Sequence, residues 1–303
     1  MTLTYLGRLL CLAAAVFFLL NLALGVAVSL ASPLAIRLAG HWRPRRAAPF
    51  LLLLRLLPGA LAALVVLAVC VPSYLWLEPG AAAEYVGAPC LGAAALGAAI
   101  WLASLARVWE AVVRSNRLVR SGTTQVAVAG ILRPKLIVSP AVADVLTPDE
   151  LAAVLAHERA HWSSRDNLKR LLVLLAPATL PFGAGFEHIE SAWLRLAEWA
   201  ADDDAVAGNP RRSLSLAAAL VRVARLQMEP APPLATSLVG EPGDLEARVA
   251  RLLSQTPVAE LRGRRVPVVR TGLAVAAAAA FGVAAAHPAT LFTVHWLLER
   301  VME

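Results

Sequence analysis

Long runs of apolar residues alternate along this chain with short arginine-rich segments. Four runs are long enough for a helix to cross the ~30 Å hydrocarbon core of a bilayer, which takes roughly 20 residues. They cover residues 9–36, 50–77, 87–105 and 268–286. Between the third and the fourth run, the pattern changes to shorter segments with both polar and apolar positions. The pattern therefore predicts about four transmembrane helices around one domain outside the bilayer.

The domain between these runs begins with a β-rich region. Residues 125–131 and 135–139 are two short β-rich stretches joined by a turn at Arg133-Pro134, and they predict a small β-hairpin. This hairpin either offers an edge along which an extended substrate binds or supports the helix that follows. Residues 229–243 are rich in proline and predict a loop.

Composition places the chain in a membrane. Of the 303 residues, 59% are hydrophobic and only 16% are charged, which is far too apolar for a soluble domain of this size. The first run is too long, and its flanks are too plain, for a cleaved signal peptide, so we expect it to be retained as a helix. The predicted fold class is a mainly α-helical membrane protein, and the lipid bilayer is an expected partner.

Arginine residues orient the predicted helices. They gather in three segments: Arg37, Arg43, Arg45 and Arg46 after the first run, Arg107, Arg114, Arg117 and Arg120 after the third, and Arg262, Arg264, Arg265 and Arg270 before or at the start of the fourth. The loop 78–89 holds two acidic residues and no basic one. The positive-inside rule then predicts a multi-pass protein of a bacterial-type inner membrane, with both termini outside. The net charge of +7 is explained by this topology and by lipid headgroups, so no direct nucleic-acid partner is expected.

This orientation divides the chain into three parts. Residues 1–112 are predicted to form an N-terminal membrane domain with three transmembrane helices. Residues 113–266 are predicted to form a cytoplasmic domain. Residues 267–303 are predicted to form a C-terminal transmembrane helix and a short extracellular amphipathic tail.

The cytoplasmic domain contains a metal-binding pattern on a well-marked helix. The sequence Thr-Pro-Asp-Glu at 147–150 supplies an N-cap, a proline at the first helical position and a capping-box glutamate. His157 and His161 follow on one face, one turn apart, so their imidazoles can share a metal ion. Glu158 is placed to hold and deprotonate a metal-bound water. A solvated charged helix face is the alternative, but it gives no reason for two histidines one turn apart.

A second pattern supplies the missing ligand. Glu198-x-x-x-Asp202 occurs in the segment EWAADDD, and Glu198 can serve as third protein ligand of one Zn²⁺ per chain. Asp202 lies one helical turn further on the same face and can accept the spare ring N–H of a ligand histidine. His188 and Arg248 are candidates for stabilising the transition state, although a structural role is an alternative for each.

The segment 168–186 is apolar enough to resemble another membrane span. A single crossing is excluded, because His161 precedes it and Glu198 follows it, and both must reach one ion. Pro177 and Pro181 interrupt the segment near its middle. It is therefore either a helix packed in the soluble domain or a hairpin that dips into the membrane.

Residues 123–253 resemble the BlaR/MecR-type antirepressor family of integral-membrane zinc metallopeptidases. The resemblance rests on the segment AGILRPKLIVSP at 129–140, on AHERAH followed by Arg165-Asp166, on Glu198-x-x-x-Asp202, and on DLEARV at 244–249. It implies a gluzincin-like zinc protease fold. It also implies that His157, His161 and Glu198 bind zinc, that Glu158 is the catalytic base, and that Asp202 orients a ligand.

Two departures from that family matter for function. No serine lies three residues before Lys135 or Lys169, so the Ser-x-x-Lys pattern of a penicillin-binding sensor domain is missing. Ala201 stands where the family often has cysteine, which is a departure towards the HtpX/CAAX-type membrane proteases.

Three functions follow as hypotheses. The first is a membrane zinc endopeptidase that cleaves a cytoplasmic protein in signal transduction. Its substrate is a repressor-like regulator or the protease itself, and a separate sensor or repressor protein is a candidate partner. The second is an HtpX-like protease for quality control of membrane proteins. The third is a non-catalytic membrane signalling or scaffold protein with a structural zinc. Glu158 argues against this third hypothesis, because a structural zinc site needs no catalytic base.

Overall fold

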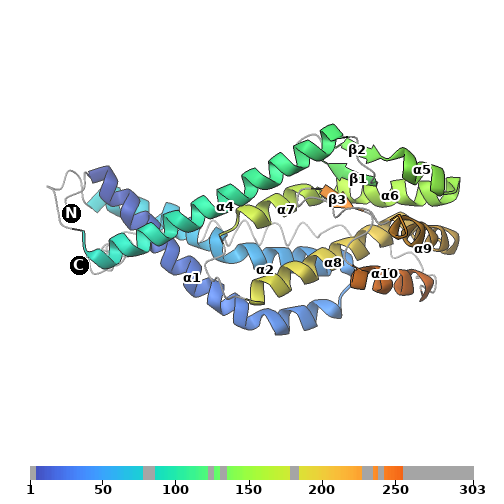
Figure 1. Cartoon of the computed structure of the whole chain (residues 1–303). Coiled ribbons are helices and arrows are strands. Elements are labelled where there is room, and N and C mark those ends of the chain that lie inside the picture. The colour runs from blue at the N-terminus through green and yellow to red at the C-terminus, as the bar shows by residue number, and fades with distance from the viewer. Residues whose placement is uncertain are drawn as a thin grey trace.

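The computed structural model describes residues 5–77, 86–121, 126–129, 135–177, 184–226, 235–237 and 242–254. Within these residues the protein is mainly helical and elongated (Figure 1). The predicted fourth span at 268–286 and the predicted tail at 290–303 lie outside the described residues.

Within the described part of the chain, three stretches of helix are long and apolar enough to cross a membrane. The first is α1 (Tyr5–Gly40). The second is α2 (Pro44–Val65), which continues through the π-helical segment η1 (Val66–Cys70) into α3 (Val71–Leu77). The third is α4 (Ala88–Ser121). These helices correspond to the first three predicted spans, and each is longer than the ~20 residues that a bilayer crossing needs.

Small residues let the membrane helices approach one another closely. Gly97 of α4 faces α1, and a Cβ atom at this position would lie 2.9 Å from the carbonyl oxygen of Ala14. Only glycine fits such a contact without moving the backbone. Beside it, the rings of Phe17 and Trp101 have their centroids 5.5 Å apart. Gly97 therefore allows α1 and α4 to pack closely, and the Phe17–Trp101 ring pair adds a contact between the two helices.

After α4, the described residues form six further helices. They are α5 (Pro140–Val145), α6 (Pro148–Ser164), α7 (Asp166–Leu175), α8 (Ala184–Val206), α9 (Pro210–Ala224) and α10 (Pro242–Ser254). Val154 of α6, Leu216 and Leu220 of α9, and Leu252 of α10 are buried in one apolar cluster. This cluster fixes α10 beside α8 and α9, which matters because α10 contributes to the site described below.

Three short strands form an antiparallel sheet. They are β1 (Val126–Ala129), β2 (Lys135–Val138) and β3 (Ala235–Ser237), in the order β2-β1-β3. Val126 is opposite Val138, and Ala127 is opposite both Ile137 and Ser237. The third strand falls in the proline-rich region expected to be a loop, because three residues carry too little pattern to predict a strand.

Helices α7 and α8 pack against the membrane helices and not only within their own domain. Val173, Ile189 and Trp193 share an apolar cluster with Val28 of α1 and Leu51 of α2. Figure 1 shows α8 running alongside α2 towards the sheet and α6. The apolar segment 168–186 is thus the end of one helix and the start of another, and residues 178–183 between them are outside the described part.

Candidate active site

Helix α6 begins as its sequence predicts. The Thr147 side chain accepts a hydrogen bond from the backbone N–H of Glu150 at 3.3 Å, and the Glu150 carboxylate accepts one from the N–H of Thr147 at 2.8 Å. Both halves of the predicted capping box are therefore present. Helix α6 ends before Arg165, which has a left-handed backbone conformation with φ of 55°. Helix α7 begins directly after this turn, at Asp166.

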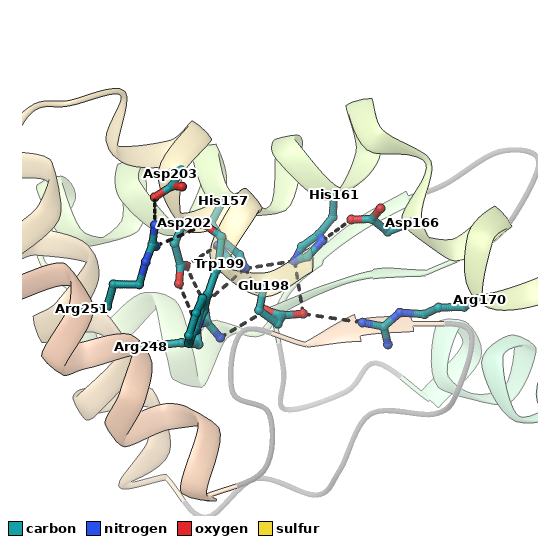
Figure 2. Close-up of polar contacts among 10 residues, drawn as sticks. All are labelled: His157, His161, Asp166, Arg170, Glu198, Trp199, Asp202, Asp203, Arg248 and Arg251. Atoms are coloured by element: carbon teal, nitrogen blue, oxygen red, sulfur yellow. Dashed lines mark hydrogen bonds and ion pairs between the residues drawn. The ribbon is translucent and has the colours of Figure 1, made fainter. Parts of the chain in front are cut away.

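Two histidines of α6 and one glutamate of α8 converge in the interior (Figure 2). Nε2 of His161 lies 3.1 Å from Nε2 of His157. The carboxylate oxygens of Glu198 lie 3.5 Å from each of these nitrogens. His157 and His161 are buried, with 0% and 2% of their surface exposed. The structure thus brings together the three residues that the sequence proposed as ligands.

The donor set fits a zinc ion. Zinc is commonly bound tetrahedrally by nitrogen and oxygen donors at about 2.0–2.1 Å, which puts neighbouring donors roughly 3.3 Å apart. Here the two histidine nitrogens lie 3.1 Å apart, and each lies 3.5 Å from a different carboxylate oxygen of Glu198. Among the described residues, these three form the group whose donor atoms could hold a metal ion. Three protein ligands also leave a fourth position for water or substrate, as catalytic zinc sites require.

Each histidine also has a carboxylate on its other ring nitrogen. Oδ1 of Asp202 lies 2.9 Å from Nδ1 of His157, as the spacing on α8 predicted. Oδ2 of Asp166 lies 2.7 Å from Nδ1 of His161. Such carboxylates fix the tautomer, so that Nε2 presents its lone pair to a metal. Asp166 was not assigned this role from the sequence, because its reach depends on the left-handed turn at Arg165.

Arg248 joins the site from α10. Its Nε and one terminal nitrogen donate to the two carboxylate oxygens of Asp202 at 2.8 and 2.7 Å. The other terminal nitrogen lies 3.2 Å from Oε2 of Glu198. Only 1% of Arg248 is exposed. These contacts show that Arg248 binds two carboxylates of the site.

His188 is not brought to this group. It is exposed on α8 and precedes Glu198 by ten residues, which is about 15 Å along a helix axis. Arg170 of α7, which the sequence analysis did not single out, lies closer: its terminal nitrogen is 3.6 Å from Oε1 of Glu198. Glu198 is therefore flanked by Arg248 on one oxygen and Arg170 on the other (Figure 2).

Charge in the site favours a bound cation. Burial would raise the pKa of Glu198, but both histidines and Arg248 hold it well below its usual range. The pKa of Asp202 is lowered to about 2, because Arg248 and His157 outweigh the effect of burial. Burial by itself would lower the pKa of His161, yet Glu198, Asp166 and Glu158 raise it to about 10. Ionised carboxylates thus surround both imidazoles and attract either protons or a metal ion.

Glu158 lies in the same pocket. It is the residue after His157 on α6 and is fully buried. Its charge contributes to the raised pKa values of His161 and Arg248. A buried carboxylate beside two metal-ligating imidazoles is the arrangement that a general base of a metal-dependent hydrolase needs.

Comparison with known protein families matches this chain to the model of peptidase family M48 over residues 116–291. This match covers 176 of the 303 residues. The chain belongs to peptidase family M48. Searches of curated proteins and of solved structures found no match.

Membership of the M48 family agrees with the site and the helices. M48 enzymes are metal-dependent peptidases, and the matched region contains all the residues that converge in Figure 2. The matched region also follows the three helices that could cross a membrane. The protein is accordingly an M48-family membrane peptidase with a buried His157, His161 and Glu198 group suited to a metal ion.

Proposed function

We propose that this protein is an integral-membrane zinc endopeptidase whose active site faces the cytoplasm. The observation that carries this proposal is the convergence of two histidines and Glu198, whose donor atoms lie within 4.8 Å of one another, with the buried Glu158 beside them. The positive segments that follow α1 and end α4 support the cytoplasmic orientation.

The residues have distinct roles in this proposal. His157, His161 and Glu198 would hold the zinc ion, which when bound polarises a carbonyl group and lowers the pKa of a water molecule. Glu158 accepts a proton from the attacking water and donates it to the leaving amine. Asp202 and Asp166 keep the imidazoles in the ligating tautomer.

The proposed substrate is a cytoplasmic protein, as in BlaR/MecR-like signal transduction. A repressor-like regulator or the protease itself would be cleaved, and a separate sensor or repressor protein would be its partner. The family match supports the peptidase and leaves this signalling role as our proposal. A winged-helix repressor gene beside this gene would favour it.

One observation favours a second candidate, an HtpX-like quality-control protease acting on membrane proteins. Helix α8, which carries Glu198 and Asp202, packs along α1 and α2. A substrate leaving the bilayer beside these helices would therefore have a short path to the site. Purified protein in nanodiscs should distinguish the two, because quality control requires cleavage of an unfolded membrane protein and signalling requires a specific soluble one.

Metal content and proteolysis test the central proposal together. Wild-type protein should contain about one zinc per chain and cleave itself or casein. Glu158→Gln should keep the zinc and lose cleavage, whereas His157→Ala or Glu198→Ala should lose most of the zinc. Stoichiometric zinc in His157→Ala would contradict the ligand assignment, and unchanged cleavage by Glu158→Gln would contradict the mechanism.

A further inference from the structure

Arg55 is a charged residue within the apolar stretch of a membrane helix. It lies in α2, and only 2% of its surface is exposed. Its Nε lies 2.5 Å from the carboxylate of Glu190, and a terminal nitrogen donates to the carbonyl oxygen of Ala176 at 3.3 Å. Its guanidinium also lies over the ring of Phe186, 4.8 Å from the centroid. The Arg55 side chain thus contacts a carboxylate, a backbone carbonyl and an aromatic ring inside the protein, and does not extend to the lipid headgroups.

All three partners belong to α7 and α8, which carry Asp166, Glu198 and Asp202 of the site. Ala176 is the C-cap of α7, whose first residue is Asp166. Phe186 and Glu190 lie in the first two turns of α8, which also carries Glu198. One side chain from the membrane domain therefore contacts the end of α7 and the start of α8. No sequence pattern indicated this contact, since Arg55 and Glu190 are separated by 135 residues.

The contacts of Arg55 can fix the position of α8 along its axis, which apolar packing against α2 leaves free. Ile189 and Trp193 of α8 pack against Leu51 of α2 in an apolar cluster, and apolar burial has no preferred direction along a helix. A guanidinium has a fixed geometry of hydrogen-bond donors, so its contacts do favour one position along the helix. Arg55 is the buried member of this pair, whereas the Glu190 side chain is 34% exposed. Sliding of α8 would leave the buried guanidinium without its counter-charge, which is strongly disfavoured.

A shift of α8 would reach the metal ligands. Glu198 follows Glu190 by eight residues, which is about 12 Å along a continuous helix. Catalytic groups must stay within ~0.5 Å of their working positions. A second ion pair between the same helices, Arg45 with Asp204 at 2.5 Å, lies beyond the site, but its arginine side chain is 66% exposed. An exposed pair contributes little, so the pair formed by Arg55, whose own side chain is buried, is the stronger constraint.

We propose that Arg55 is a positioning residue through which membrane helix α2 sets the register of α8, and with it the position of Glu198. The inference rests on the proposed zinc-protease function of the site. It makes the membrane domain part of the catalytic apparatus: a change in α2 alters the geometry of a metal ligand without touching the metal.

The test compares full-length variants in nanodiscs: Arg55→Gln, Arg55→Lys, Glu190→Gln and the Arg55→Gln/Glu190→Gln double variant. Zinc affinity is measured by chelator competition, and kcat and KM are measured on casein. Direct partners of ligand histidines typically contribute ~10–100-fold to affinity or activity, so a residue one contact further should contribute roughly 3–10-fold. We expect Arg55→Gln and Glu190→Gln each to weaken zinc retention and kcat by such a factor, with KM little changed.

The remaining variants separate positioning from simple stability. The double variant should be no worse than the poorer single variant, because both remove the same interaction. Arg55→Lys, which keeps the charge, should retain most of the zinc affinity. The matched control is Arg114→Gln, which removes an exposed ion pair with Glu110 on α4 and should behave as wild type. Glu190→Gln continues to carry the test if Arg55→Gln does not fold.

Contrary outcomes are distinct. If folded Arg55→Gln and Glu190→Gln proteins keep wild-type zinc affinity and kcat, and only the yield of folded protein falls, the positioning role is wrong. Additive effects in the double variant would also overturn it. Absence of zinc from the wild-type protein would refute the proposed function and this inference with it, whereas zinc-loaded, unaffected variants would refute the inference alone.

Discussion

Oδ2 of Asp166 lies 2.7 Å from Nδ1 of His161 and gives this histidine the same kind of partner that Asp202 gives His157. Asp166 is itself held by the ammonium group of Lys169 at 2.7 Å. In both imidazoles, the nitrogen that points away from Glu198 therefore has an ionised carboxylate beside it. Each histidine thus has an aspartate at its Nδ1, although the two aspartates come from different helices.

Asp166→Asn should lower zinc affinity without abolishing it. The neutral amide can still accept a hydrogen bond but no longer provides the negative charge that raises the basicity of His161, and such changes typically cost ~10–100-fold in affinity or activity. Chelator competition and turnover would measure the effect. Asp144→Asn, at an exposed position, is the control and should match wild type. A wild-type affinity in Asp166→Asn would show that this hydrogen bond does not orient a ligand.

Asp202→Asn should be more damaging than Asp203→Ala. Asp202 contacts both His157 and Arg248 inside the site, so its loss should leave measurable zinc and reduce turnover by ~10–100-fold. Asp203 pairs instead with Arg251, and both side chains are partly exposed. Its removal should cost little, since partly exposed pairs contribute up to about 1 kcal/mol. Equal damage from the two substitutions would contradict the orientation of α8 in the site.

Zinc uptake by the metal-free protein should release protons even at pH 8. The pKa of His161 is raised to about 10 by Glu198, Asp166 and Glu158, which together outweigh burial, so this imidazole is protonated at pH 8 in the absence of metal. A ligand nitrogen must give up its proton to bind zinc, and apparent affinity should therefore rise with pH from 7 to 9. Calorimetry in buffers of different ionisation enthalpy counts the protons. Release of none at pH 8 would mean that His161 titrates at its ordinary pKa.

The active site should face the cytoplasm. Arginines follow α1 and end α4, whereas the loop 78–89 has none, and basic segments are retained on the cytoplasmic side. A reporter enzyme fused after Gly122 should behave as cytoplasmic, and one inserted in 78–89 as external. The reverse pattern would move the substrate to the other compartment.

The local features of this protein were determined by its sequence. Histidines four residues apart must share a face once a helix forms, and Thr147-Pro148-Asp149-Glu150 ensures that it forms, because capping depends only on neighbouring residues. The same reasoning placed Asp202 one turn beyond Glu198. The first three apolar runs likewise predicted the long helices, since the length of an apolar run sets what can cross a bilayer.

Contacts between distant segments were decided only by the tertiary structure. Arg248 reaches Asp202 across 46 residues of sequence and Arg55 reaches Glu190 across 135, and no periodicity links such pairs. Even Asp166, five residues from His161, reaches it through a left-handed turn at a non-glycine residue, which local propensity does not predict. His157 with His161 on α6, and Glu198 with Asp202 on α8, could be predicted because each pair has a fixed spacing along one helix. Their convergence in one site, and the groups that hold them there, depend on how several helices pack.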